Sequence, residues 1–330
     1  MELSDVFKEK RTLITGGMGF IGSNLAHRLV SLGARVSIVD SGDSSMGANP
    51  FNLADILNQV DLKVADLRDD QVIERMIAGQ EYLFNLAGQA SHAGSMEDPL
   101  ADLEINARCQ LSIVEACRKH NPGIKIIYAG TRQSYGQVRQ MPVDESHPID
   151  PVDYNGISKR AGELYHLVAH RIFGLNACSL RMTNVYGPRM RCRDGHLNFI
   201  GLWIRRIIEG KPIPVYGQGT QIRDPNFVDD VIEAMLLAAA SPISNGQVYN
   251  LGGLEAVRLI DLADRMIETA GGGSRVFKPF PEARRRIDIG DYQANFSKIQ
   301  RQLGWQPRVA LTEGLTRTID FFRLNQEHYW

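Results

Sequence analysis

Cysteine is scarce in this sequence, and neither sign of charge dominates it. Only four of the 330 residues are cysteines, and no two of them form a C-x-x-C pair. This pattern excludes a small disulfide-stapled domain and favours reduced, mostly buried thiols. Lysine and arginine total 37 against 38 acidic residues, which leaves a net charge of −1. Because such a chain has no broad electrostatic field, we expect neither nucleic acid nor a membrane as a partner.

Targeting and membrane-spanning patterns are also lacking. Residues 1–10 are polar and carry both signs of charge, unlike a secretory signal or a transit peptide. The longest apolar run, near Met235–Ala240, is far shorter than the roughly 20 residues that cross a bilayer. We therefore expect a cytoplasmic protein. Its length suits one large α/β unit or two domains that share a cleft.

Short apolar runs alternate with amphipathic ones through the first half of the chain. Strands are predicted at Thr12–Thr15, Arg35–Asp40, Leu62–Ala65, Tyr82–Ala87, Lys125–Ala129 and Ala177–Arg181. Helices are predicted at Ile21–Leu32, Gln71–Ala78, Leu100–His120 and Asn155–Phe173. The alternation indicates right-handed βαβ crossovers and a doubly wound parallel sheet of the Rossmann type. This sheet should be about complete by Arg181.

The composition changes after Asn184, where proline and glycine cluster and arginine becomes dense. This pattern favours a smaller, loop-rich, mixed α/β lobe. We predict a first, Rossmann-type domain at residues 1–183 and a mainly substrate-binding lobe at residues 184–330. Residues 227–240 and 248–252 again resemble a helix and a buried strand. The chain is therefore expected to return to the first domain at about residues 222–253.

A glycine-rich turn follows the first predicted strand and opens the first helix. Gly16 permits the tight turn, Gly19 lets backbone N–H groups approach a pyrophosphate, and Gly22 lets the helix pack on the strand. The helix N-terminus attracts the negative charge. An ordinary loop is the alternative, but the position between strand and helix favours a dinucleotide site. Phe20 and Ile21, inside the turn, belong to the same predicted site.

An acidic residue stands where such a site binds the adenosine ribose. Asp40 ends the second predicted strand, about 18 residues after Gly22. Its carboxylate could accept hydrogen bonds from the ribose hydroxyls and would repel a 2′-phosphate, which favours NAD over NADP. A turn or helix cap within residues 40–43 is the alternative. Asp66 and the adjacent Leu67, after the third predicted strand, are similarly placed near the adenine.

Several motifs together resemble those of a known family. Residues 15–22 (TGGMGFIG) resemble the opening of the extended short-chain dehydrogenase/reductases, which include sugar-nucleotide epimerases and dehydratases. The resemblance continues with NLAG at residues 85–88 and EIN at residues 104–106. Further family motifs are matched at residues 131–136, 181–188, 223–230, 249–253, 297–298 and 303–307. So many ordered motifs make this resemblance far more specific than the glycine turn alone.

The resemblance implies hydride chemistry on a nucleoside-diphosphate sugar, with NAD as a tightly bound cofactor and the protein supplying orientation and proton handling. Leu86, Ala87 and Asn106 would contact the cofactor. Lys159 would hold the nicotinamide ribose, and Thr131 would bind the reacting hydroxyl.

The resemblance also implies a substrate set. Arg223 and an arginine of the run 284–286, namely Arg285 or Arg286, would clamp the diphosphate, because guanidinium forks suit that geometry. Asn184 would hydrogen-bond the same group, and Ser95 would contact the sugar. A solvated basic face is the alternative for at least one of the three consecutive arginines.

The helix that carries the family's Tyr-x-x-x-Lys motif departs from the pattern. Alignment of residues 153–163 places Asn155, rather than a tyrosine, four residues before Lys159. Only that spacing shares a helix face with the lysine, and Tyr154 lies about 100° round the helix. The resemblance implies that the family's tyrosine is the general base, and an amide cannot abstract a hydroxyl proton near neutral pH. A positioned acid–base group raises the rate by about 10² to 10⁴-fold.

Three interpretations of this departure compete. A local distortion at the helix start could bring Tyr154 into the site. Alternatively, His92, Tyr135 or a water held by Thr131 could transfer the proton. In the third interpretation, the site binds its ligand without the usual oxidation.

A second departure follows Thr131. In the 4,6-dehydratases of the family an Asp-Glu pair stands there, whereas this sequence has Arg132 and Gln133. We therefore predict an isomerase, which epimerises its substrate by transient hydride transfer to tightly bound NAD with a non-standard base. A catalytically silent binding protein and a reductase or dehydratase of a keto-sugar nucleotide are the alternatives. Arg132 could pair with an acidic sugar or form a structural salt bridge.

Two further patterns could indicate a zinc site and a nucleophilic thiol. His166 and His170 have a spacing that can bind zinc, but no further ligand is suggested, so an exposed or interface pair is favoured. Cys192 lies between two arginines, which could depress its pKa and make it nucleophilic.

The helices at Leu100–His120 and Asn155–Phe173 could also form a subunit interface. Their apolar stripes consist of Leu111, Ile113, Val114, Tyr165, Leu167 and Val168. Family members pair these helices across a two-fold axis, so the resemblance implies a homodimer. Core packing is the alternative explanation of the stripes.

Overall fold

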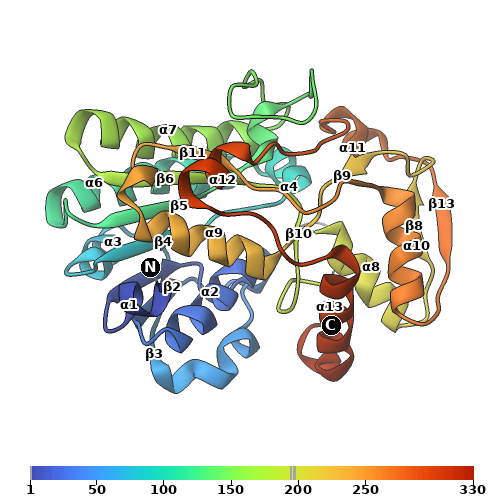
Figure 1. Ribbon diagram of the computed structural model, residues 1–330, viewed down its shortest axis with the longest axis horizontal. Helices are drawn as coiled ribbons and strands as arrows, with labels where there is room; N and C mark the ends of the chain where they lie inside the picture. Colours follow the sequence, from blue (N-terminus) through green and yellow to red (C-terminus); the bar gives the residue numbers. More distant parts are fainter. Residues whose placement is uncertain (1, 194, 196–197) are drawn as a thin grey trace.

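A parallel sheet of seven strands is the centre of the computed structural model, which describes residues 2–193, 195 and 198–330 (Figure 1). The strands are β1 (Arg11–Thr15), β2 (Arg35–Asp40), β3 (Val60–Val64), β4 (Tyr82–Asn85), β5 (Lys125–Thr131), β6 (Asn176–Met182) and β11 (Val248–Asn250). Their order is β3-β2-β1-β4-β5-β6-β11. The winding direction reverses between β1 and β4, which is where open parallel sheets form their binding crevice.

Helices cover both faces of this sheet, because successive side chains of a buried strand point to opposite sides. On one face, Ile14 and Phe84 join the apolar cluster of α1 (Leu3–Phe7), α2 (Phe20–Ser31) and α9 (Val228–Ala240). On the other face, Leu13 and Leu83 join the cluster of α3 (Asp70–Ile77), α6 (Cys109–His120) and α7 (Tyr154–Phe173). The doubly wound Rossmann-type architecture predicted from the sequence is confirmed.

The predicted strands agree with the structure, but the predicted end of the sheet does not. All six lie within two residues of an observed strand. However, the sheet is not complete at Arg181. After the excursion into the smaller lobe, α9 packs on the sheet and β11 pairs in parallel with β6, so that Tyr249 lies opposite Leu180. The seventh strand therefore comes from a distant part of the chain.

The predicted single helix at Leu100–His120 is three consecutive pieces. It consists of α5 (Pro99–Leu103), a π-helical turn at Glu104–Arg108 and α6. Such wide turns insert an extra residue and reorient side chains, and they are frequent at functional sites. Here the π turn contains Asn106, whose side chain is fully buried.

The smaller lobe is mixed α/β and adjoins the sheet (Figure 1, right). Its strands pair as β7 (Val185–Tyr186) with β10 (Asn226–Phe227), β8 (Ile213–Tyr216) with β13 (Arg275–Lys278), and β9 (Ile222–Arg223) with β12 (Val257–Arg258). Its helices are α8 (Phe199–Ile208), α10 (Leu259–Thr269), α11 (Glu282–Arg286) and α13 (Leu311–Leu324). Helix α12 (Ser297–Leu303) lies instead against β11 of the large sheet (Figure 1), where Lys298 Nζ donates to the carbonyl of Val248 at 2.9 Å. One apolar cluster joins Ile14 to Trp203 and Leu315, so the two parts share a core. Among the described residues, no helix has the length and apolarity to cross a membrane.

Helix α7 is attached to the sheet by a buried ion pair. The Glu163 carboxylate accepts hydrogen bonds from Arg181 Nε at 3.0 Å and Nη2 at 2.7 Å, and from Ser179 Oγ at 2.8 Å. The two charged side chains are 1% and 3% exposed. Burial by itself raises the pKa of Glu163, but the charges of Arg181 and Arg160 and the hydrogen bonds from Arg181 and Ser179 together outweigh this effect, so the net pKa is lowered.

We expect Glu163→Gln to lower the free energy of unfolding by about 3–5 kcal/mol, because it leaves the buried Arg181 charge uncompensated. The measurement is urea unfolding at neutral pH. A group whose pKa is lowered on folding stabilises the fold above its unfolded pKa. The difference between variant and wild type should therefore shrink as the pH falls below about 4.5, the ordinary pKa of the carboxyl.

Glu115→Gln is the matched control, since Glu115 forms a surface ion pair with Arg118 on α6 and should change stability little. Equal effects of the two substitutions would contradict the proposed anchoring of α7.

Candidate cofactor and active site

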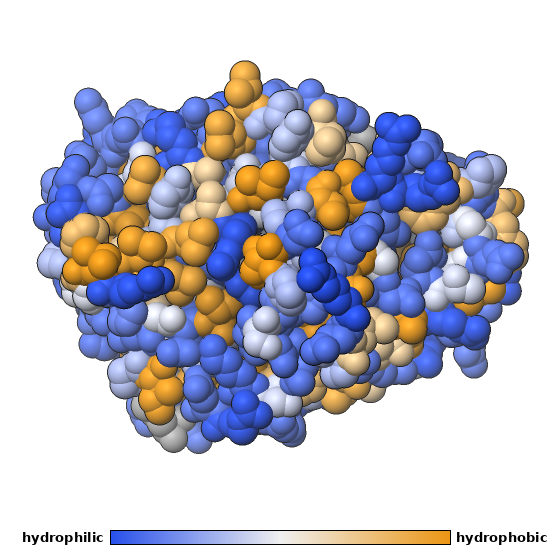
Figure 2. Space-filling model, turned by 90° about the horizontal axis from the view of Figure 1, so that it is seen from above, coloured by the Kyte–Doolittle hydropathy of each residue, from blue (hydrophilic) through white to orange (hydrophobic). Residues whose placement is uncertain are grey.

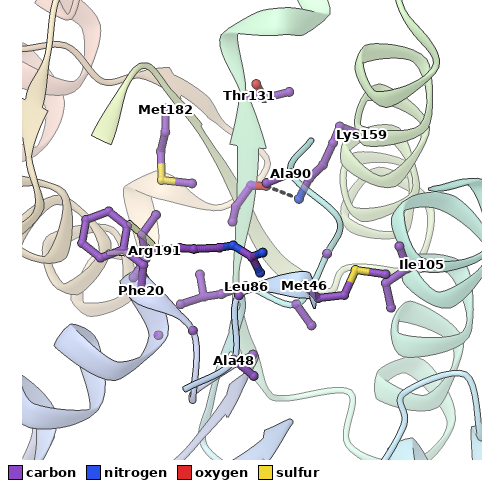
Figure 3. Close-up of a pocket in the computed structure, with 18 of the residues that line it drawn as sticks. Phe20, Met46, Ala48, Leu86, Ala90, Ile105, Thr131, Lys159, Met182 and Arg191 are labelled. Atoms are coloured by element: carbon purple, nitrogen blue, oxygen red, sulfur yellow. Dashed lines mark hydrogen bonds between the residues drawn. The ribbon is translucent and has the colours of Figure 1, made fainter. Parts of the chain in front are cut away.

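A cleft of about 560 Å³ lies at the carboxyl ends of the strands (Figure 3). It is bounded by the turn after β1, by the ends of β2, β4, β5 and β6, and by residues 190–191. Eleven of the twelve residues predicted to bind the cofactor line it: Gly16, Gly19, Phe20, Ile21, Gly22, Asp40, Asp66, Leu67, Leu86, Ala87 and Lys159. The remaining one, Asn106, is fully buried behind the cleft wall. The fold thus gathers the predicted cofactor residues around one cavity.

The glycine turn has a backbone that other residues could not adopt. Gly16 has a φ of +72°, which L-residues with a side chain rarely adopt. A Cβ on Gly22 would lie 2.3 Å from the carbonyl oxygen of Gly16. The turn can therefore lie tightly against the first turn of α2, which leaves backbone N–H groups at the cleft. This cradle fits the pyrophosphate of a dinucleotide.

Asp40 makes the turn cap that the sequence offered as one alternative, and it also lines the cleft. Its Oδ1 accepts a hydrogen bond from Gly42 N, which is a turn cap, and its Oδ2 accepts one from Met18 N in the glycine turn, each at 2.9 Å. The residue is 7% exposed, and burial raises its pKa. Because the carboxylate also lines the cleft, it stands where a ribose hydroxyl could reach it.

Lys159 projects from α7 into the cleft beside β5 (Figure 3). Its Nζ donates a hydrogen bond to the carbonyl of Ala129 at 3.2 Å and lies 5.5 Å from the ring centre of Tyr128. Burial lowers the pKa of Lys159 to about 8. At neutral pH the group is therefore still mostly a cation and a hydrogen-bond donor.

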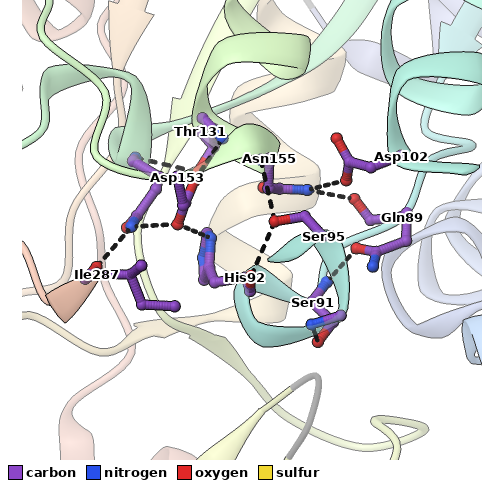
Figure 4. A network of polar contacts seen from close by, with 12 residues as sticks. Gln89, Ser91, His92, Ser95, Asp102, Thr131, Asp153, Asn155 and Ile287 are labelled. Atoms are coloured by element: carbon purple, nitrogen blue, oxygen red, sulfur yellow. Dashed lines mark hydrogen bonds and ion pairs between the residues drawn. The ribbon is translucent and has the colours of Figure 1, made fainter. Parts of the chain in front are cut away.

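Asn155 lines the cleft, but its amide group is occupied by structural contacts (Figure 4). Its Nδ2 donates to the carbonyl of Gln89 at 2.8 Å and to Oδ2 of the buried Asp102 at 3.0 Å. Asn106 Nδ2 donates to the same two acceptors, each at 2.9 Å. The two amides thus tie α7 and the π turn to the loop after β4, since buried acceptors need donors.

The structure does not bring Tyr154 into the cleft. Helix α7 begins regularly at this residue, with Asp153 as its N-cap, and the Tyr154 side chain is 46% exposed. Tyr135 is fully buried; its hydroxyl donates to Asn250 at 2.7 Å and accepts from Arg181 at 2.7 Å. Neither tyrosine lines the cleft, whereas His92 and Thr131 do.

Of the predicted substrate residues, Thr131 and Asn184 line the cleft. Between them lies Arg132, whose Nη2 donates to Asn184 Oδ1 at 3.0 Å and whose guanidinium stacks over Tyr292. Burial lowers the pKa of Arg132 to about 10. Within the described ranges Arg132 forms no ion pair, so the structural salt bridge considered from the sequence is not made.

Four other predicted substrate residues do not line this cleft. Ser95 is buried, where its Oγ donates to the carbonyl of His92 at 2.8 Å and accepts from Asn155 N at 3.2 Å. Arg223 pairs with Asp288 at 3.0 Å. Arg285 and Arg286 are exposed on α11 and pair with Glu282. Their roles in substrate binding stay predictions.

Sequence reasoning missed Arg191, whose guanidinium group lies in the middle of the pocket (Figure 3). It donates to the carbonyls of Ser44 and Ser45, the latter at 3.0 Å, and so bridges two segments far apart in sequence. The dense arginines after Gly187-Pro188 were the available signal.

The structure opposes the nucleophilic Cys192 that the sequence allowed, and the expectation that His166 is exposed was wrong. Cys192 is fully buried, and burial raises the pKa of its thiol well above the ordinary value, which opposes thiolate formation. His166 is also fully buried rather than exposed; it stacks on Tyr128, and burial lowers its pKa to about 4. The sequence could not reveal this burial, because it depends on how α7 lies on the sheet.

Comparison with known proteins gives consistent matches. The profile of the NAD dependent epimerase/dehydratase family matches residues 12–252. UDP-glucose 4-epimerase of Mycolicibacterium smegmatis is 31% identical over 318 residues, 95% of this chain and 98% of that protein. dTDP-glucose 4,6-dehydratase of Streptomyces niveus is 28% identical over 324 residues, 96% and 94% of the two chains. The crystal structure of Thermotoga maritima UDP-glucose 4-epimerase with UDP-glucose has a TM-score of 0.88 and 31% identity, and the match covers 96% of this chain and 99% of that one.

We expect Gly22→Ala to weaken NAD binding at least about tenfold, or about 1.4 kcal/mol, because the new Cβ forces α2 away from the turn. Calorimetric titration of cofactor-free protein with NAD measures the change. Gly123→Ala is the control, since a Cβ there meets no atom within 4 Å. Unchanged affinity in Gly22→Ala would contradict the assignment of the turn.

Proposed function

The chain belongs to the NAD dependent epimerase/dehydratase family, and from this membership we propose that it epimerises a carbon of a nucleoside-diphosphate sugar. The proposal rests on the hydrogen bonds of Gln133, which stands where 4,6-dehydratases of the family have an acidic residue. Its Nε2 donates to Asp153 Oδ2 at 2.7 Å and to the carbonyl of Ile287 at 3.2 Å. A neutral amide bound in this way can neither take nor give a proton near neutral pH, whereas elimination of water requires both a base and an acid.

The cofactor is NAD, which when bound accepts a hydride from a sugar carbon and can return it to the other face, so that no net redox change results. The residues of this chain bind and orient. The glycine turn holds the pyrophosphate, Asp40 the adenosine ribose and Lys159 the nicotinamide ribose. Thr131, at the end of β5, holds the reacting hydroxyl in the same cleft.

The relatives support the broad chemistry and include both outcomes. One named as an epimerase is 31% identical and one named as a dehydratase 28%, so identity alone does not separate these activities. The Gln133 contacts are what favour epimerisation. The UDP-glucose in the Thermotoga structure makes uridine nucleotide sugars the first substrates to test.

The test loads the protein with NAD and follows UDP-, GDP-, CDP- and dTDP-sugars by NMR. We expect one sugar to be converted to its epimer without accumulation of NADH. A 4-keto-6-deoxy product would instead indicate a dehydratase, and stoichiometric consumption of added NADH a reductase. No turnover of any sugar would favour a silent binding protein.

Matched variants separate intrinsic activity from contamination. Thr131→Ala and Lys159→Ala should abolish turnover, whereas Thr316→Ala, on the exposed side of α13, should leave it unchanged.

We also propose that the chain forms a homodimer through α6 and α7. Four exposed apolar residues, Ile157, Leu164, Val168 and Ile172, follow one face of α7, and Leu111 is exposed on α6. Figure 2 shows apolar side chains gathered on this side of the molecule, at the left of the view. By contrast, two stripe residues, Ile113 and Val114, are buried in the core, where core packing explains them.

A charge in this face should dissociate the dimer. We expect Val168→Glu to be monomeric in light scattering coupled to gel filtration, because a carboxylate cannot be buried there without a partner. Leu324→Glu, at a residue that is 85% exposed on α13, should keep the mass of the wild type. A monomeric wild type, or an unchanged mass for Val168→Glu, would overturn the proposed interface.

A further inference from the structure

His92 is an ionisable side chain in the cleft for which the cofactor contacts provide no role. It is the first residue of α4 (His92–Glu97), and it lines the cleft together with Thr131, Asn155 and Lys159. Its side chain is 38% exposed, so a ligand in the cleft can reach the imidazole. Figure 4 shows the ring next to the carboxylate of Asp153.

The Asp153 carboxylate is completely buried and is held by hydrogen bonds from two donors, Gln133 and Gly156. Oδ2 lies 3.0 Å from His92 Nδ1 and 2.7 Å from Gln133 Nε2. Oδ1 accepts from Gly156 N at 2.6 Å, as the N-cap of α7. The carboxylate therefore lies against the imidazole, at the start of the helix that carries Lys159.

The charge of this carboxylate, 3.0 Å from Nδ1, favours one tautomer of the ring. A neutral imidazole carries one proton, and a carboxylate beside Nδ1 keeps that proton on Nδ1. Nε2 then has a lone pair available, and within the described part of the chain this atom makes no hydrogen bond. A buried aspartate on Nδ1 with Nε2 at the reaction site is the arrangement in which histidine acts as a general base.

Of the two departures from the family pattern, Gln133 contacts this dyad, whereas the Asn155 amide lies against other residues. A glutamate at residue 133 would place a second carboxylate against Asp153, whereas the amide of Gln133 donates a hydrogen bond to it. Asn155 cannot serve as a base, and its own amide is occupied by Gln89 and Asp102. This chain thus has no tyrosine four residues before Lys159, but it has an imidazole in the same cleft.

We propose that His92 Nε2, oriented by Asp153, is the general base that takes the proton of the reacting sugar hydroxyl. The inference rests on the proposed function, because it names the base for that reaction. His92 is the catalytic residue of the pair, and Asp153 is a positioning residue.

Oxidation of the sugar couples this proton transfer to a hydride transfer. The O–H bond of the sugar breaks, its proton goes to Nε2, and its electron pair forms the C=O bond. The C–H bond of the carbon that bears this hydroxyl breaks at the same time. Its hydrogen leaves with both electrons to the oxidised nicotinamide, which is the oxidant. Asp153 lies beside the imidazolium, which returns the proton when the carbonyl is reduced.

Lys159 is the other titratable group nearby, and it is less suited to this role. Its pKa of about 8 leaves it mostly protonated at neutral pH, and its Nζ already donates to Ala129. It can orient and attract the developing oxyanion, but it has no lone pair to accept the proton.

The first test needs no turnover. In the full chain labelled with ¹⁵N-histidine, the ring signals assigned to His92 by their loss in His92→Gln should show the Nδ1–H tautomer with an unprotonated Nε2. UDP-glucose should shift the Nε2 signal, and Asp153→Asn should change the tautomer balance. A proton on Nε2 of the neutral wild-type ring would overturn the proposal, even if no sugar is turned over.

The second test uses epimerisation of UDP-glucose, or of whichever sugar the panel identifies. His92→Gln should lower kcat by about 10² to 10⁴-fold with little change in KM, and added imidazole should partly restore His92→Ala. Asp153→Asn should lower kcat without such rescue. His120→Gln, at the exposed end of α6, should match the wild type. Wild-type kcat in His92→Gln together with loss of activity in Tyr154→Phe would overturn the proposal.

Discussion

The buried ion pair between Glu163 and Arg181 determines where α7 lies, and the site depends on this helix. Lys159 and Asn155 reach the cleft from α7, and its N-cap, Asp153, contacts His92. The helix can approach the sheet closely because Gly162 has no side chain; a Cβ there would lie 2.5 Å from the hydroxyl of Tyr128. A charge pair and a close packing contact thus fix the distance between the lysine and the strand ends.

The asparagine at residue 155 is explained by a structural role. Its amide and that of Asn106 share the carbonyl of Gln89 and the buried carboxylate of Asp102 as acceptors. This network joins α7, the π turn and the loop after β4, because buried polar groups must find partners. The position that carries a base elsewhere in the family therefore stabilises the cleft wall in this chain.

The proposed base lies on α4 rather than on α7, but it is oriented by the cap of α7. Asp153 connects the two elements, and Gln133 completes the contact from the end of β5. Gln133, one of the two departures from the family pattern, is thus a direct neighbour of this carboxylate. In the proposal, His92 and Asp153 replace the tyrosine in proton handling in the same cofactor cleft.

The sequence by itself determined six strands of the sheet, the glycine turn and the family, and it predicted that Asp40 and Lys159 hold NAD, because these depend on periodicity and short-range motifs. Only the tertiary structure decided that Tyr154 faces away from the cleft, that His92 meets Asp153 and that Arg191 enters the pocket. It also placed β11 in the sheet and Arg285 on the surface. Each of these depends on contacts between residues far apart in the chain, which local patterns do not encode.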